Sequence, residues 1–101
     1  MTIFAPTNSA FEKLPPHRFQ ALLADPESLR AVLLRHVTAG RLESSDLPEG
    51  PSTLITGAGE QVTIASLPLG VTLIGPFGSA NVIDADVAAS NGVIHVVDSI
   101  F

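Results

Sequence analysis

The chain has 101 residues, of which 46% are apolar, and carries a formal net charge of −5 at pH 7. This length predicts one domain with a single core, and the apolar content argues against disorder. The five basic residues are scattered over the N-terminal half and form no cationic stripe. We therefore expect no nucleic-acid partner and no attraction to an anionic membrane surface.

Cysteine is absent, which excludes disulfides and thiolate metal sites. The N-terminus lacks the basic segment and apolar core of a signal peptide, and no apolar run is long enough to span a bilayer. We expect no membrane-spanning segment. If the protein is exported, we expect this chain to be a mature fragment or to have lost its targeting segment.

The N-terminal segment predicts a strand followed by a short helix. The strand at residues 3–5 is apolar and ends at the proline that follows. Thr7 and Asn8 carry the oxygen acceptors that cap helices, so we expect both to cap the next helix. Ser9 and Glu12 have the spacing of a capping box.

Two further helices are predicted before residue 40. Pro15-Pro16 ends the first helix, and apolar residues at helical spacing follow it. Asp25-Pro26-Glu27 supplies a capping acceptor, a proline at the first helical position and a carboxylate in the first turn. The apolar face of this helix leads to His36, which we expect to mark the helix end or the first residue of the next strand and to join helix and strand.

The second half of the chain predicts strands separated by glycine and proline. Residues 44–51 form a surface connection, and Gly57-Ala58-Gly59 forms a hairpin turn. Strands are expected at residues 53–56, 61–65, 71–74, 82–87 and 93–101. Helices that precede strands predict an α+β domain with a mostly antiparallel sheet.

The pair Asn91-Gly92 predicts the last hairpin turn, with positive φ at both positions. This turn places Ala88 opposite His95 and Asp86 opposite Val97. Both faces of the hairpin carry apolar side chains, so we expect it to be covered on both sides.

Three segments resemble, in order, the signatures of the fasciclin-like domain family. Thr2 to Phe11 is similar to the N-terminal signature, and residues 91–98 to the C-terminal signature. Residues 33–42 are similar to the central Tyr-His segment, with Arg35 in the place of the tyrosine. The chain is therefore identified as a member of this family.

The resemblance implies a fold: a wedge of two packed, mostly antiparallel β-sheets with helices along one side. It implies a single domain over residues 1–101 that is N-terminally shortened, because the family's domain begins with further helices. Apolar surface normally covered by these helices would then need a partner or a second copy, so we expect the chain either to form a homodimer or to expose an apolar patch. The alternative is a pocket between sheet and helices that carries a small apolar ligand or lipid.

Two acidic residues and one histidine are the candidates for chemistry. Asp84 and Asp86 are two residues apart and share a strand face, but no further ligand accompanies them, so neither a metal site nor a cofactor is predicted. His95 is expected to be neutral and bonded to a backbone carbonyl or a carboxylate, with Asp86 nearby. Thr7, Asn8, Asn91-Gly92 and His95 are the structural signature residues.

The resemblance also suggests a contact surface. In animal members of the family, a short Asp-Ile segment and the Tyr-His segment are assigned to integrin contact. Asp86-Val87 and Arg35-His36 occupy the matching places, with valine for isoleucine and arginine for tyrosine. These changes favour a general protein or glycan contact surface formed by Arg35, His36, Asp84, Asp86 and Val87.

The resemblance implies a non-enzymatic adhesion or interaction module. It would be secreted, periplasmic or at the cell surface, with a cell-surface or matrix protein or glycan as partner. A hydrolase that uses Asp84, Asp86 and His95 is the least favoured class. No Gly-x-Ser-x-Gly motif is present, and the spacing of the three histidines indicates no nucleophile and base pair.

Overall fold

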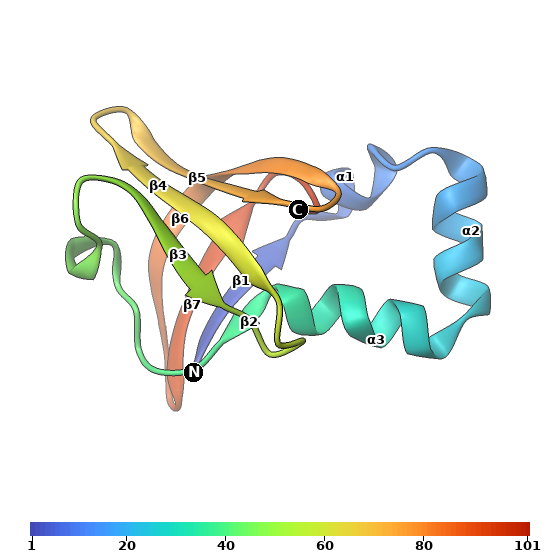
Figure 1. The fold of residues 1–101 in the computed structure, drawn as a ribbon, viewed down its shortest axis with the longest axis horizontal. Coiled ribbons are helices and arrows are strands. Elements are labelled where there is room, and N and C mark those ends of the chain that lie inside the picture. Colours follow the sequence, from blue (N-terminus) through green and yellow to red (C-terminus); the bar gives the residue numbers. More distant parts are fainter.

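A computed structural model describes all 101 residues, Met1 to Phe101. Seven strands form a mixed sheet, and three α-helices extend from one end of it (Figure 1). The strands are β1 (Thr2–Pro6), β2 (Val37–Thr38), β3 (Gly50–Ile55), β4 (Gln61–Leu67), β5 (Gly70–Gly75), β6 (Gly78–Ala89) and β7 (Gly92–Val97). The helices are α1 (Asn8–Glu12), α2 (Pro16–Ala24) and α3 (Pro26–Arg35), with a 3-10 turn, η1 (Ser44–Asp46). The predicted α+β class is confirmed.

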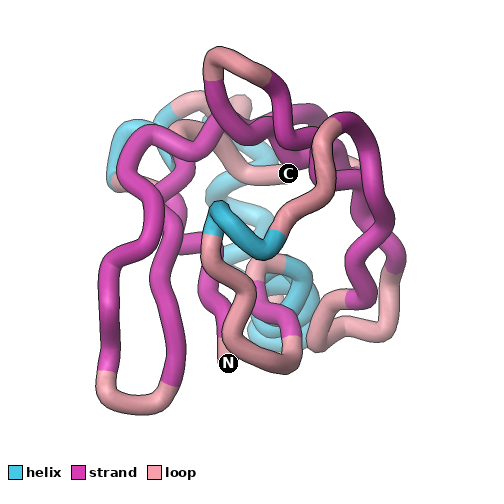
Figure 2. The backbone as a smooth tube through the Cα atoms, turned by 90° about the vertical axis from the view of Figure 1, so that its left-hand side faces the viewer, coloured by secondary structure: helices cyan, strands magenta, loops and turns pink.

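The sheet has the order β2-β1-β7-β6-β5-β4-β3 and is folded over on itself. Strand β6 is long enough to pair with β5 through its first part and with β7 through the remainder, so it belongs to both layers. An isolated bridge between Thr38 and Thr56 brings the two ends of this order together. Figure 2 shows the resulting walls of strands facing each other.

The one parallel pair, β1 with β7, brings the two ends of the sequence together. Thr2 pairs with Val93, and the register continues to Pro6 opposite Val97. The backbone N–H of Val93 also donates to the Met1 carbonyl, over 3.1 Å. All other strand pairs are antiparallel, as predicted.

Two apolar clusters hold the elements together. The larger one fills the space between the two layers and consists of Phe4, Val62, Ile64, Leu73, Ala80, Val97 and Phe101. The smaller one joins the helices to the sheet and is centred on Leu22, Val32 and Ile100, with Phe11, Leu14 and Phe77 packed against it. Ile100 and Phe101 after β7 therefore belong to the core, although residues 98–101 are not the continued strand that the sequence predicted.

The helix starts follow the capping chemistry only in part. The Thr7 hydroxyl accepts from the Ala10 N–H (3.1 Å), and the Asp25 carboxylate accepts from the backbone N–H groups of Glu27 and Ser28. Asn8 is the first residue inside α1 and not a cap. The expected Ser9 capping box is absent because the helix begins earlier, at the Thr7 cap.

The β6–β7 turn corrects the predicted register. Ala89 pairs with Gly92, so Ser90 and Asn91 form the loop, and Asp84 lies opposite Val96 after an irregularity in the ladder. Neither Asn91 nor Gly92 has positive φ. The glycine is required for a different reason: a Cβ at Gly92 would lie 1.8 Å from the Met1 carbonyl oxygen.

The hairpin is also less covered than predicted. Its β7 side chains alternate between buried and half-buried positions, but residues 83–88 of β6 are exposed. A second irregularity lies between Asp84 and Val87. It breaks the alternation of faces that the sequence pattern implied.

Thr7→Ala should lower the free energy of unfolding by about 1 kcal/mol, because it removes the acceptor of the Ala10 N–H. Asn8→Ala should leave stability within about 0.5 kcal/mol, because Asn8 lies inside the helix and not at its cap. Urea midpoints of both variants test this difference. Equal losses in the two variants would contradict Thr7 as the cap.

Gly92→Ala should cost about 1–3 kcal/mol, because its methyl group must displace the Met1 backbone from the start of β1. Ser90→Ala, in the exposed loop beside it, is the control and should be nearly neutral. Thermal or urea unfolding measures both. A Gly92→Ala protein as stable as the parent would show that β1 does not approach β7 at this point.

Candidate functional site

The three signature segments meet inside the molecule, around Phe4 of β1. The Phe4 ring stacks on His95 of β7, with ring centres 5.5 Å apart, and packs edge-on against Phe101 at 6.0 Å. The ring centre of Phe101 in turn lies 4.0 Å from the ring centre of His36. We call these four residues the aromatic row. It runs from one histidine to the other through two phenylalanines.

His36 fixes the end of α3 to the end of the chain. Its Nδ1–H donates to the Val32 carbonyl over 2.8 Å, and its Nε2 accepts from the Phe101 N–H over 3.3 Å. The His36 carbonyl accepts from the Phe4 N–H over 2.7 Å. His36 therefore connects helix, strand and C-terminus, which is the structural role that the sequence predicted.

His95 fixes the other end of the aromatic row. Its Nδ1 accepts from the Asp86 N–H over 3.1 Å, and its Nε2–H donates to the Leu42 carbonyl over 2.7 Å. The Asp86 carboxylate is farther away, 4.0 Å from Nδ1. The expected carbonyl partner is thus present, and the contact with Asp86 runs through its backbone.

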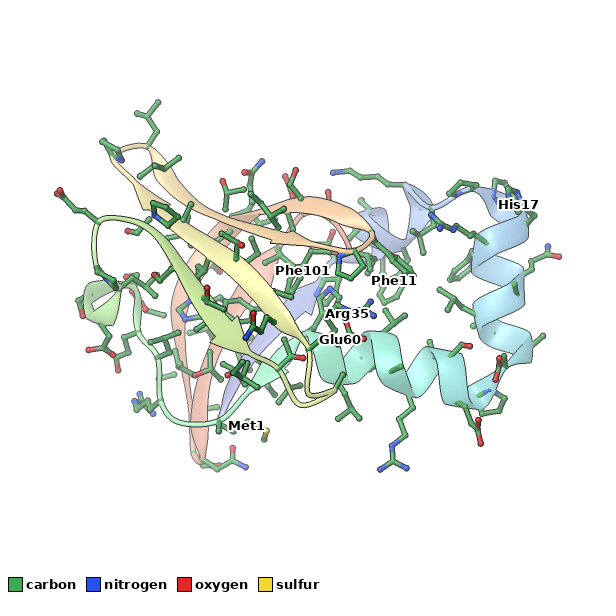
Figure 3. The ribbon with its side chains drawn as sticks, in the orientation of Figure 1. Met1, Phe11, His17, Arg35, Glu60 and Phe101 are labelled. Atoms are coloured by element: carbon green, nitrogen blue, oxygen red, sulfur yellow. The ribbon has the colours of Figure 1, made fainter.

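Each of these histidines faces one donor and one carbonyl oxygen, and only a neutral imidazole satisfies both. His36 is 2% exposed and His95 4% exposed, so the ring nitrogens of both histidines are shielded from solvent. Burial lowers the pKa of His36 below its usual range, with the Arg35 charge adding to this effect and the Val32 carbonyl opposing it. His17, the third histidine, lies at the start of α2 (Figure 3).

Arg35 forms an internal ion pair. Its guanidinium makes two hydrogen bonds to the Glu60 carboxylate, of 2.7 and 3.1 Å (Figure 3). It also packs over the Phe77 ring at 5.3 Å. The bond from Arg35 lowers the pKa of Glu60. Arg35 is only 7% exposed. The burial of Arg35 and His36 removes both from any surface that a partner meets, which corrects the expected contact surface.

Asp86 shapes the β6 edge. It has φ of 60°, the one positive φ outside glycine, at the irregularity in the β6–β7 ladder. Its carboxylate accepts from the Ser44 N–H (2.7 Å) and from the Ser44 hydroxyl. These two bonds, the hydroxyl first, lower the pKa of Asp86. Asp86 thus joins η1 to β6, and its carboxylate oxygens are used in hydrogen bonds within the chain.

Asp84 and Val87 are the members of the predicted contact surface that face solvent freely. No group of three or more histidine or acidic side chains comes together to hold a metal ion. Neighbouring Ile83 is 58% exposed and Val87 38% exposed. This part of β6 therefore combines apolar side chains with an unpaired carboxylate.

An open groove of about 700 Å³ lies among α1, α2 and α3. Its wall is mostly apolar and consists of Asn8, Phe11, Glu12, Leu14, Pro16, Phe19, Leu22, Leu23 and Leu29. The expected pocket between sheet and helices is thus replaced by a groove between helices. Figures 1 and 3 show α2 standing apart from the sheet, across this space.

Sequence reasoning missed Ser44, Glu60 and Phe77. Glu60 had no detectable signal, because its contact with Arg35 joins residues 25 positions apart in the sequence. Ser44 and Phe77 had none, since their contacts with Asp86 and Arg35 cross from one element to another.

A bent sheet with one parallel pair between its terminal signatures, closed by helices at one end, defines a fasciclin-type domain. The profile of the Fasciclin domain family matches residues 1–101, and the chain belongs to this family. A solved FAS1 domain pair from the insect cell adhesion molecule Fasciclin I superposes with a TM-score of 0.82 at 26% identity, covering 99% of this chain and 36% of that one.

Two relatives show how widely this domain is distributed. Protein sll1483 of Synechocystis sp. is 38% identical over 101 residues, which is 98% of this chain and 53% of that protein. Transforming growth factor-beta-induced protein ig-h3 of Sus scrofa is 33% identical over 107 residues, covering 98% of this chain and 14% of that protein. The chain thus spans about half the length of the Synechocystis relative. None of its helices has the length and apolar character needed to cross a membrane.

Stability should decrease as the pH falls below about 6.5, the ordinary pKa of histidine. The pKa of His36 is lower in the folded state than in the unfolded chain, so the unfolded chain binds a proton at this histidine first as the pH falls. This proton binding stabilises the unfolded chain relative to the folded state. Urea midpoints between pH 7.5 and 5.5 should fall for the parent and for His17→Ala. His36→Gln should show a lower midpoint and a flatter profile, whereas an unchanged slope would contradict the assignment to His36.

Proposed function

We propose that this domain is a non-enzymatic adhesion or protein-interaction module that works outside the cytoplasm, at a cell surface, in the periplasm or in the medium. Membership in the Fasciclin domain family supports this proposal. The similarity to a FAS1 domain pair from an insect cell adhesion molecule supports it further.

The observation that carries the proposal is the contrast between side chains that are bonded inside the molecule and side chains that remain exposed to solvent. His36, His95 and Arg35 are buried and bonded internally, so they act as structural groups. Several large apolar side chains of the strand layers remain exposed instead: Ile55, Leu67, Leu69, Ile74, Ile83 and Val87. Among them, Ile83 and Val87 belong to the same exposed stretch of β6, where a partner could contact both.

The proposed contact surface lies on the exposed part of β6 and uses Ile83, Asp84 and Val87. Asp86 contributes by holding the shape of this edge through Ser44. A cell-surface or matrix protein, or a glycan without negative charge, suits the acidic character of this surface.

A second candidate is the carrier of a small apolar ligand or lipid. The groove among α1, α2 and α3 favours it, because its volume of about 700 Å³ lies in the range of small-molecule sites. No cofactor is needed in either function.

An adhesion assay tests the first proposal. Beads coated with the protein should retain cells or matrix of the native host under flow, and Asp84→Lys with Val87→Lys should reduce retention by at least about fivefold. Glu49→Lys with Leu33→Lys changes two exposed side chains elsewhere and is the matched control.

Equal retention by both double variants would place the contact away from β6. Absence of retention by the parent protein would contradict the adhesion function. A lipid or apolar metabolite released from the purified, inactive protein would then favour the carrier.

A further inference from the structure

The sheet has an unpaired edge beside a notch. The ladder between β5 and β6 ends where Thr72 pairs with Asn81, although β6 continues to Ala89. From Val82 onward, β6 pairs only with β7. One side of this part of β6 therefore presents backbone groups that no neighbouring strand uses.

A concavity of about 170 Å³ opens where β5 and β6 separate. We call it the edge notch, and its wall consists of Leu67, Leu69, Gly70, Val71, Thr72, Asn81 and Val82. Leu69 at the β4–β5 turn is fully exposed, and Leu67 is 53% exposed. The notch thus offers apolar side chains next to a free strand edge.

The charge around the notch has one sign. Every lysine and arginine lies at or before Arg41. The remaining chain, which contains β3 to β7, carries only acidic charges, at Glu43, Asp46, Glu49, Glu60, Asp84, Asp86 and Asp98. Asp84 stands on the free edge itself and is exposed. A second copy of this edge would be repelled, whereas a cationic segment would be attracted.

We propose that the edge notch binds an extended peptide segment of alternating apolar and basic residues, which pairs with β6 as an additional strand. This inference deepens the proposed interaction function and rests on it. Side chains alternate along a strand, so the apolar ones would contact Leu67 and Leu69 while the basic ones approach Asp84.

The bulge at Asp86 limits the length of this pairing. Irregularities of the β6–β7 ladder lie between Val82 and Asp84 and between Asp84 and Val87, and Asp86 within the second has φ of 60°, so this edge offers only short regular stretches. A short segment suits this edge better than a long strand. The same bulge, together with the two aspartates, protects the edge from uncontrolled sheet growth.

The test uses a six-residue peptide of alternating valine and lysine, with both ends blocked, and the isotope-labelled protein. Amide resonances of Val82 to Ala85 and of Leu67 to Thr72 should shift on titration, and the affinity should fall as salt is added. A peptide with glutamate in place of lysine should not bind. A lysine peptide with alternate N-methylated amides should bind at least about tenfold more weakly, because strand pairing needs its N–H groups.

Two exposed substitutions probe the site without disturbing the core. Asp84→Lys and Leu69→Ser should each weaken the peptide by about fivefold or more. Glu49→Lys, an exposed charge reversal outside the notch, is the control. Shifts confined to α1, α2 and α3, or equal binding by Asp84→Lys, would overturn the proposal.

The two proposals fail in different ways. Retention of host cells without peptide binding would leave the adhesion function standing and remove the strand-addition site. Peptide binding at β6 without retention of cells would support the strand-addition site and contradict the adhesion function. Self-association of the protein through β6 would appear as concentration-dependent shifts of the same amides. It would contradict the proposal that a cationic peptide occupies this edge.

Discussion

The parallel pairing of β1 with β7 is the constraint on which the remaining structure depends. It places Phe4 beside His95, and the chain end then folds back so that Phe101 fills the space between Phe4 and His36. A parallel pair needs a long connection, and here it contains all the helices and most of the sheet. The two ends of the chain therefore close the core around everything between them.

The buried histidines act as donors and acceptors for backbone that lies outside regular ladders. His36 satisfies Phe101 and Val32, and His95 satisfies Asp86 and Leu42. Buried backbone groups without partners are costly, so each imidazole replaces hydrogen bonds that a loop or chain end cannot make. This explains why histidines occur in two of the signature segments without any catalytic neighbour.

The charged side chains fall into two groups, those that bond inside the molecule and those that remain without a partner at the surface. Arg35 is neutralised by Glu60, and Asp86 is satisfied by Ser44, so Arg35 serves packing and Asp86 serves loop attachment. Asp84 has no such partner and lies on the exposed part of β6, two residues beyond Val82 of the notch. The proposed interaction surface therefore begins where internal bonding ends.

The sequence alone determined the order of elements, the Thr7 and Asp25 helix starts and the end of α3 at His36, because these depend on nearby residues. Tertiary structure decided the register of the last hairpin, the bulge at Asp86 and the pairing of Arg35 with Glu60. Gly92 illustrates the difference: its sequence context indicates a turn, but the close approach of Met1, at the opposite end of the chain, makes it a strand residue with no room for a side chain. Contacts across such distances leave no periodic pattern in the sequence, so only the folded chain reveals them.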